Sequence, residues 1–299
     1  MKDISNWKDN VIQKSLISKD GLKISYELID YGAERTVVLA NGLGGRLYVW
    51  EPLIEKLLPD FKIICWDYRG LFESKAHFKI KRLAIREHAE DLKAILEDEN
   101  ISKASVTGWS MGVQVALEFA SLYPENTDKL VLLNGTYGHA LSTGFQPLMR
   151  MPSLSRIFHE VIDFVKNRQS LIEIISKLMV FKPFIYPLGS LYGVIRGNPK
   201  IGDAIYQYVQ DVFGSDFSNY LRLFQELDAH STYHHLREIY NPTLIVWGNL
   251  DYLTPAYQSK EMLRKLPNAE KVSFLFGTHF VLLEYPEKVP RKILEFLNK

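Results

Sequence analysis

One serine of this chain has the surroundings of a reactive nucleophile. Ser110 is the centre of the sequence Gly-Trp-Ser-Met-Gly (108–112), after a β-prone run (104–107) and before a helix-favouring run (113–122). A strand that turns sharply into a helix lifts a serine hydroxyl clear of the backbone, and a Cβ at either glycine would collide with the neighbouring strand or helix. The N–H groups at the start of the helix also face any negative charge that forms beside the hydroxyl. The five-residue pattern alone is weak, so its setting and its partners decide its meaning.

A serine hydroxyl becomes a strong nucleophile only when a base takes its proton and a third group orients that base. Two later apolar runs end in residues of the required kinds. Asp251 lies just past the run 243–247, and His279 lies just past the run 271–276. Both therefore fall in loops after later strands, in the order serine, acid, histidine. These spacings predict nucleophilic catalysis by Ser110 with His279 as base and Asp251 as its partner.

Each of these assignments has a competing interpretation. Ser110 could be a simple turn residue, Asp251 a residue that precedes a helix, and His279 a partly buried histidine beside an apolar run. Asp67 is the nearest rival acid, but it precedes the serine, and we expect it to brace a loop. Asn134, at the end of another predicted strand, carries no charge and cannot serve as an anionic partner. The catalytic interpretation is favoured because all three residues follow buried strands in one consistent order.

Short apolar strands alternate with amphipathic helices on both sides of these residues. This alternation predicts a doubly wound, mostly parallel sheet, that is, an α/β fold. The first two strands are joined at Asp20-Gly21, a good hairpin signal. The predicted strands are 11–18, 22–29, 36–40, 61–66, 104–107, 130–133, 243–247 and 271–276, and the predicted helices are 50–58, 83–99, 113–122, 256–266 and 287–297.

The alternation stops between residues 137 and 240, where no convincing buried strand appears. Apolar residues there recur at helical spacing, as in the run from Leu154 to Val165, and prolines divide the segment. A stretch of this length is too long for a bare loop. We therefore expect a core domain of residues 1–136 and 241–299 with a helical cap, or lid, of residues 137–240 inserted in it.

Aromatic residues are frequent in the predicted cap. We expect most of them to pack the cap itself and some to line a pocket over Ser110. The candidates are Phe145, Phe158, Phe164, Phe181, Phe184, Tyr186, Tyr192, Tyr206, Tyr208 and Phe213.

Other polar residues are assigned structural roles. Arg69 could bind a substrate carboxylate, but a structural ion pair is the favoured interpretation. His230, His234 and His235 suggest a metal site, because residues four apart share a helix face. No acid–histidine zinc pattern accompanies them, so we interpret them as solvated cap residues and predict no metal site.

Composition limits the cellular setting. The net charge of +1 provides no basic field for nucleic acid, and no stretch approaches the 18 apolar residues of a membrane span. The polar first ten residues do not resemble a signal peptide. Cys65 is the only cysteine, which excludes an internal disulfide and suits a reducing compartment. We expect a cytoplasmic enzyme without a nucleic-acid partner, and the sequence leaves its oligomeric state open.

Five motifs in order resemble those of the α/β-hydrolase superfamily, and the resemblance covers the chain except for the cap. They are Asn41-Gly42-Leu43-Gly44-Gly45, Asp67-Tyr68-Arg69-Gly70, the Gly-Trp-Ser-Met-Gly turn, Gly248-Asn249-Leu250-Asp251 and Gly277-Thr278-His279. The resemblance implies an α/β-hydrolase fold with an inserted helical cap, and a Ser110–His279–Asp251 triad that needs no metal or organic cofactor.

The resemblance also implies where the oxyanion is held. It assigns the oxyanion hole to the backbone N–H groups of Leu43 and Met111. The chain departs from its relatives at two points. Asn41 replaces a more common histidine, although its amide can still hold the loop, and Leu71-Phe72-Glu73 brings apolar bulk near that loop. Neither departure removes a catalytic atom.

The expected reaction is acyl transfer to water through an acyl-enzyme, as in a carboxylesterase. The substrate expected is a small, fairly apolar ester or related carbonyl compound, because the predicted cap is rich in aromatic residues. Carbon–carbon bond hydrolysis, thioester cleavage, lactone opening and perhydrolysis use the same triad. A small-ligand receptor of the same fold is the alternative outside enzymes.

Overall fold

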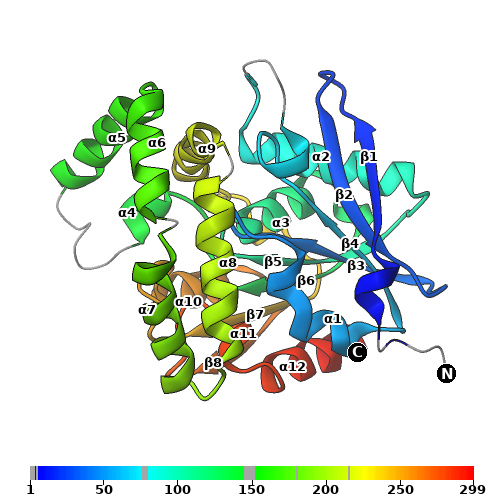
Figure 1. Ribbon diagram of the computed structural model, residues 1–299. Helices are drawn as coiled ribbons and strands as arrows, with labels where there is room; N and C mark the ends of the chain where they lie inside the picture. Colours follow the sequence, from blue (N-terminus) through cyan, green and yellow to red (C-terminus); the bar gives the residue numbers. More distant parts are fainter. Residues whose placement is uncertain (1–3, 5, 76–79, 145–151, 180, 215) are drawn as a thin grey trace.

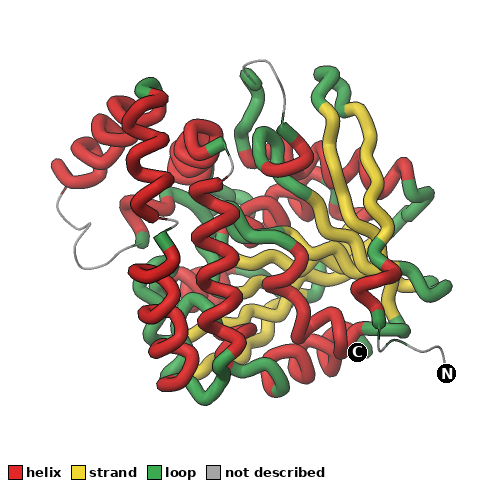
Figure 2. The backbone as a smooth tube through the Cα atoms, viewed as in Figure 1, coloured by secondary structure: helices red, strands yellow, loops and turns green. Residues whose placement is uncertain are grey.

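An eight-stranded sheet forms the centre of the molecule (Figures 1 and 2). The strand order is β1-β2-β4-β3-β5-β6-β7-β8, and the strands from β4 to β8 run parallel. The strands are β1 (Ile12–Ile17), β2 (Lys23–Ile29), β3 (Arg35–Ala40), β4 (Phe61–Trp66), β5 (Ala104–Trp109), β6 (Thr127–Leu133), β7 (Thr243–Gly248) and β8 (Ala269–Phe274). The computed structural model describes residues 4, 6–75, 80–144, 152–179, 181–214 and 216–299.

Helices cover both faces of the sheet. The helices outside the segment between β6 and β7 are α1 (Glu51–Leu57), α2 (Ile85–Asp98), α3 (Met111–Leu122), α10 (Ala256–Lys265), α11 (Val281–Glu284) and α12 (Lys288–Leu297). One core joins α1, α11 and α12 to the sheet, and the other joins α2, α3 and α10 to its opposite face. In α12, Val289, Ile293 and Phe296 are buried at helical spacing, which fixes the face that it turns to the sheet. The predicted doubly wound α/β architecture is confirmed.

The last strand is displaced from its predicted position, and β6 begins three residues before its predicted start. β8 lies at Ala269–Phe274, two residues before the predicted run 271–276. Leu275 and Phe276 follow it and are 65% and 64% exposed. β8 is an edge strand that pairs with β7, and the chain turns at Gly277, whose N–H donates to the Phe274 carbonyl. Apolar content alone therefore placed the strand too far along the chain.

The segment between β6 and β7 is helical in the part that the structure describes. Its helices are α4 (Ala140–Thr143), α5 (Pro152–Lys166), α6 (Gln169–Met179), α7 (Lys182–Ile195), α8 (Lys200–Gly214) and α9 (Phe217–Ala229). In Figure 1 they form one group beside the sheet, with α5 farthest from β1 and β2. α5 packs on α9, and α6 packs on α8. None of the described helices has the length and apolar character needed to span a lipid bilayer.

The apolar side of α5 is less buried than its spacing predicts. Ile162 is 4% exposed, but Ile157 and Val161 are 50% and 52% exposed. The helical pattern correctly indicated a helix. It did not indicate how much of the apolar side is covered, because that depends on the neighbouring helix.

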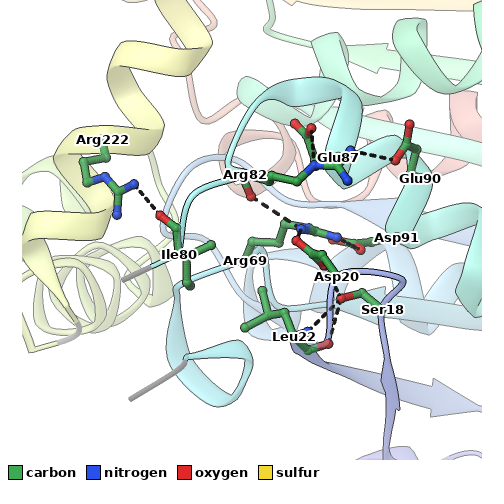
Figure 3. A network of polar contacts seen from close by, with 10 residues as sticks. All are labelled: Ser18, Asp20, Leu22, Arg69, Ile80, Arg82, Glu87, Glu90, Asp91 and Arg222. Atoms are coloured by element: carbon green, nitrogen blue, oxygen red, sulfur yellow. Dashed lines mark hydrogen bonds and ion pairs between the residues drawn. The ribbon is translucent and has the colours of Figure 1, made fainter. Parts of the chain in front are cut away.

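Arg69 forms the structural ion pairs that its sequence context favoured. Its guanidinium donates to both carboxylate oxygens of Asp91, at 2.6 and 2.7 Å, and to Asp20 at 2.7 Å (Figure 3). Ser18 in turn donates to Asp20 at 2.6 Å. The side chains of Arg69 and Asp91 are 4% and 2% exposed, so each charge is paired where water is excluded. This cluster joins the β1–β2 hairpin to α2 beneath the loop that follows β4.

A buried histidine beside this cluster makes stability depend on pH. Burial, with a smaller contribution from the Arg69 charge, lowers the pKa of His88 to about 3 from its usual 6.5. The unfolded chain therefore binds a proton below pH 6.5 that the folded chain does not. The stability associated with neutral His88 is fully present above pH 6.5 and is lost as the pH falls toward 3.

We predict that His88→Leu weakens this acid sensitivity. Between pH 8 and pH 5 the free energy of unfolding of the native chain should fall by about 2 kcal/mol more than that of the variant. Urea unfolding at both pH values measures the difference. Equal losses in the two proteins would show that His88 is not the responsible group.

Candidate active site

Close packing of two backbones shapes the turn at Ser110. Ser110 joins β5 to α3 with φ 57° and ψ −116°, an unusual conformation for a residue with a side chain. A Cβ at Gly108 would lie 2.2 Å from the Gly112 carbonyl oxygen, and a Cβ at Gly112 would lie 2.0 Å from the Ala40 oxygen. Both positions therefore require glycine. The predicted strand–turn–helix is present, with half-buried Ser110 at the carboxyl end of β5 and the start of α3.

His279 and Asp251 meet at the carboxyl ends of β7 and β8. Nδ1 of His279 lies 2.9 Å from Oδ2 of Asp251, and both side chains are nearly inaccessible, at 8% and 0% exposed. Burial alone would raise the pKa of Asp251, but His279 and the hydrogen bonds of Thr254 hold it below its usual value. The carboxylate therefore stays charged beside the imidazole, which makes Nδ1 the donor in this hydrogen bond.

Further donors fix the Asp251 carboxylate. Its Oδ1 accepts hydrogen bonds from the backbone N–H groups of Leu253, at 2.9 Å, and Thr254, at 2.8 Å. Its Oδ2 accepts from Oγ1 of Thr254 at 2.7 Å and from Nδ2 of Asn134 at 2.6 Å. The sequence correctly excluded Asn134 as an anion but did not reveal this role. Its place after β6, at the same sheet edge, is the signal that points to it.

The backbone on either side of His279 is held by side chains from other elements. Nε1 of Trp109 donates to the His279 carbonyl at 3.0 Å, and Asn134 donates to the Thr278 carbonyl at 3.0 Å. Glu284 accepts from both the N–H and the Oγ1 of Thr278, at 2.8 Å each. The imidazole is therefore fixed through its main chain as well as through Asp251. Sequence reasoning did not single out Trp109 or Glu284 for this function.

The loop after β3 carries the predicted oxyanion donor Leu43. Asn41 holds the base of this loop: its amide donates to the Trp66 carbonyl at 3.1 Å and accepts from Nε1 of Trp50 at 2.8 Å. The Asn41 carbonyl accepts from the Tyr68 hydroxyl at 2.7 Å. The expectation that Asn41 can hold the loop in place of histidine agrees with these contacts.

Asp67 supports the neighbouring loop. Its Oδ2 accepts from the Glu73 N–H at 3.1 Å, and its Oδ1 lies 3.7 Å from Nε of Arg46. Burial raises the pKa of Asp67 to about 6, although the Arg46 charge opposes this change. The guanidinium of Arg46 also lies over the ring of Phe72, 4.8 Å from its centre. The apolar bulk expected near the loop is therefore packed against Arg46.

A cavity of about 300 Å³ brings the candidate residues together. Ser110 and His279 both line it, as do Leu43 and Met111. From the described part of residues 137–240, the lining includes Ala140, Tyr208, Tyr220, Phe224 and Leu227. The other lining residues are Trp109, Thr136, Leu253, Thr254 and Phe280.

The aromatic residues predicted for the pocket lie in different environments. Of that set, Tyr208 lines the cavity, while Phe158, Phe164 and Phe181 are 40%, 52% and 59% exposed. Phe213 packs on Phe217, 4.7 Å away between ring centres. Phe145 lies outside the described residues, and so does the side chain of Phe184. The pocket aromatics that the sequence missed, Tyr220 and Phe224, come from α9, because α9 rather than α5 lies over Ser110.

The histidines after α9 need one correction. His230 is not solvated: its ring nitrogens lie 2.6 Å from Oε1 of Gln114 and 3.1 Å from Oε2 of Glu118, and the side chain is 16% exposed. It joins the end of α9 to α3. His234 and His235 are exposed, as expected.

Comparison with known proteins places the chain in a family. The family model described as "alpha/beta hydrolase fold" matches residues 35–286, so this protein belongs to the α/β-hydrolase fold family. It is similar to the protein named "Putative carbamate hydrolase RutD" from Rhizobium rhizogenes, with 28% identity over 90% of this chain and 95% of that one. It is also similar to the 2-hydroxy-6-oxononadienedioate/2-hydroxy-6-oxononatrienedioate hydrolase 2 of Pseudomonas putida, with 27% identity over 93% and 92% of the two chains. The structure of a hydrolase from Pseudomonas aeruginosa PA01 superposes with a TM-score of 0.76 at 19% identity, covering 99% of this chain and 100% of that one.

The contacts of Asp251 lead to a matched pair of variants. Asp251→Asn should lower kcat on the order of ten-thousandfold, because its amide NH₂ would face the donors of Asn134 and His279 and favour the wrong imidazole tautomer. Asp67→Asn makes the same change in a second buried aspartate and should alter mainly stability. Steady-state kinetics and thermal unfolding of both variants measure the contrast. If the two results were exchanged, Asp67 and not Asp251 would be the acid.

Proposed function

We propose that the protein is a serine hydrolase that cleaves an ester-type acyl bond of a small, uncharged, fairly apolar substrate. One observation carries this proposal: Ser110 and His279 line the same apolar cavity, and His279 is paired behind it with the buried Asp251. Ser110 would be the nucleophile, His279 the base and Asp251 the group that orients His279. The family membership and the hydrolase names of the relatives support hydrolysis as the reaction class.

The reaction would proceed in two acyl transfers. His279 takes the hydroxyl proton as Oγ of Ser110 attacks the carbonyl carbon, and the N–H groups of Leu43 and Met111 bind the resulting oxyanion. The intermediate collapses, His279 passes its proton to the departing alcohol, and an acyl-enzyme remains. His279 then takes a proton from water as the water oxygen attacks the acyl carbon. When this second intermediate collapses, His279 returns the proton to Oγ of Ser110, and the acid is released. The chain's own side chains and backbone supply every group used.

The cavity lining favours an uncharged substrate. Neither lysine nor arginine occurs among its lining residues in the described part of the chain, and most of its side chains are apolar or aromatic. A dioate such as the one in the name of the Pseudomonas putida relative carries two carboxylates, which would lie here without a cationic partner. Esters of short or medium acyl chains fit the lining better. Thioesters, lactones and carbamates share the reactive carbonyl and belong in the same substrate panel.

We also propose that residues 137–240 act as a cap on a core of residues 1–136 and 241–299. The three proposed catalytic side chains lie in the core segments, whereas one wall of the cavity comes from α8 and α9. A wall of this kind excludes water and positions the acyl chain. The cap would thus set the substrate range.

The first test is Ser110→Ala. It should lower kcat roughly a millionfold on p-nitrophenyl esters, because the triad acts as a unit, while the folded structure is retained. A fluorophosphonate probe should label the native chain once, at Ser110. Activity that survives the substitution, or labelling at another serine, would contradict the proposal. Stoichiometric ligand uptake without turnover by the native chain would favour a receptor instead.

The second test concerns the cavity wall. Phe224→Ala should enlarge the cavity, so kcat/KM for a p-nitrophenyl octanoate should rise relative to that for the acetate, by about three- to tenfold. Phe213→Ala is the matched control, since Phe213 packs on Phe217 and does not line the cavity. An unchanged ratio in Phe224→Ala would mean that α9 does not limit the acyl chain.

A further inference from the structure

The loop that carries Leu43 forms a tight turn, and such a turn can adopt either of two backbone conformations. The Gly45 N–H donates to the Gly42 carbonyl at 2.9 Å, so residues 42–45 form a β-turn with Leu43 and Gly44 at its centre. Gly44 has φ +78°, as a type II turn requires at that position. Type I and type II turns differ by a flip of the central peptide. That flip would carry the Leu43 carbonyl to the opposite side of the turn.

A tyrosine from α8 contacts this central peptide. The hydroxyl of Tyr208 donates to the Leu43 carbonyl at 2.7 Å. The Tyr208 ring meets Trp109, the residue before Ser110, edge-on with 6.2 Å between ring centres. Burial raises the pKa of Tyr208 well above its usual value, with hydrogen bonding to Tyr220 as a smaller cause. The hydroxyl therefore remains a protonated donor across the working pH range.

Two helices of the proposed cap, α8 and α9, also pack against this turn. A Cβ at Gly44 would lie 2.6 Å from Cγ2 of Val212, on α8, and 3.0 Å from Cε2 of Tyr220, on α9. The turn is therefore pressed between the core and these helices. Because Tyr208 has one hydroxyl proton and gives it to Leu43, Tyr220 is the donor between the two tyrosines.

We propose that Tyr208 is a positioning residue for the oxyanion loop: its hydrogen bond holds the 42–45 turn in the form that keeps the Leu43 N–H in place. The inference rests on the proposed function and extends it, because it gives the cap a part in catalysis besides binding the acyl chain. Tyr208 lines the cavity, and its hydroxyl acts on the loop through the Leu43 carbonyl. The Leu43 N–H belongs to the peptide group that precedes the one held by Tyr208, and the two groups are joined at the Leu43 Cα. A turn free to flip would not keep that N–H at a fixed point.

The test compares Tyr208→Phe with Tyr206→Phe. Both lie on α8, but the Tyr206 hydroxyl accepts from Gln210 on the same helix and its ring meets Tyr186 on α7. On p-nitrophenyl acetate, Tyr208→Phe should lower kcat by about 10- to 50-fold and change KM by less than about twofold. Tyr206→Phe should leave both constants near the native values.

A trifluoromethyl ketone distinguishes positioning from loss of folded structure. Oγ of Ser110 adds to the ketone carbon, the proton passes to His279, and the negative oxygen occupies the oxyanion site. The inhibition constant should therefore rise in Tyr208→Phe by about the factor by which kcat falls. If Tyr208→Phe unfolds at a lower temperature, Tyr220→Phe, which removes the donor behind Tyr208, should give a smaller loss of kcat in the same direction.

Each remaining outcome overturns the inference. Native-like kinetics in Tyr208→Phe would show that the turn holds without the hydrogen bond. A rise in KM alone would make Tyr208 a substrate contact, and a fall in kcat without a weaker ketone would place its effect outside the oxyanion loop. Failure of the proposed function is seen separately, as the absence of Ser110-dependent turnover in the native chain.

Discussion

A carboxylate buried from solvent constrains the arrangement of the whole site. A charge in this environment costs several kcal/mol unless hydrogen-bond donors surround it. Asp251 meets this requirement with donors from the end of β6 (Asn134), from its own loop after β7 (Leu253 and Thr254) and from the loop after β8 (His279). Three strand ends are therefore joined by one charge. These hydrogen bonds therefore fix the relative positions of the three loops at the candidate site.

Much of this arrangement could be predicted from the sequence. A Cβ at position 108 or 112 would collide with neighbouring backbone, so both positions must be glycine. The turn at Ser110 was predictable because this pair of glycines is visible in the sequence. Asp251 and His279 were placed together because parallel strands end at one sheet edge, and apolar runs locate those ends to within a few residues. The fold class followed from the same alternation.

The remaining features depend on contacts that no local pattern encodes. Asn134 donates to Asp251, 117 residues away in the chain, and Glu284 accepts from Thr278, six residues away. Neither residue occurs in a sequence pattern that would indicate these contacts. Between β6 and β7, helical periodicity predicted the helices but not which of them faces Ser110. Phe224 lines the cavity, whereas Phe158 is 40% exposed. The difference arises from the packing of α5 on α9, which helical periodicity does not indicate.

Acyl transfer through Ser110 is the step on which the proposed function depends. Rapid quenching of the native chain with p-nitrophenyl acetate, followed by mass spectrometry of the digested protein, tests it most directly. We expect a burst of about one equivalent of nitrophenol whenever deacylation is the slower step, and one acetyl group on the peptide that contains Ser110. Acetylation confined to another residue, with turnover intact, would contradict it.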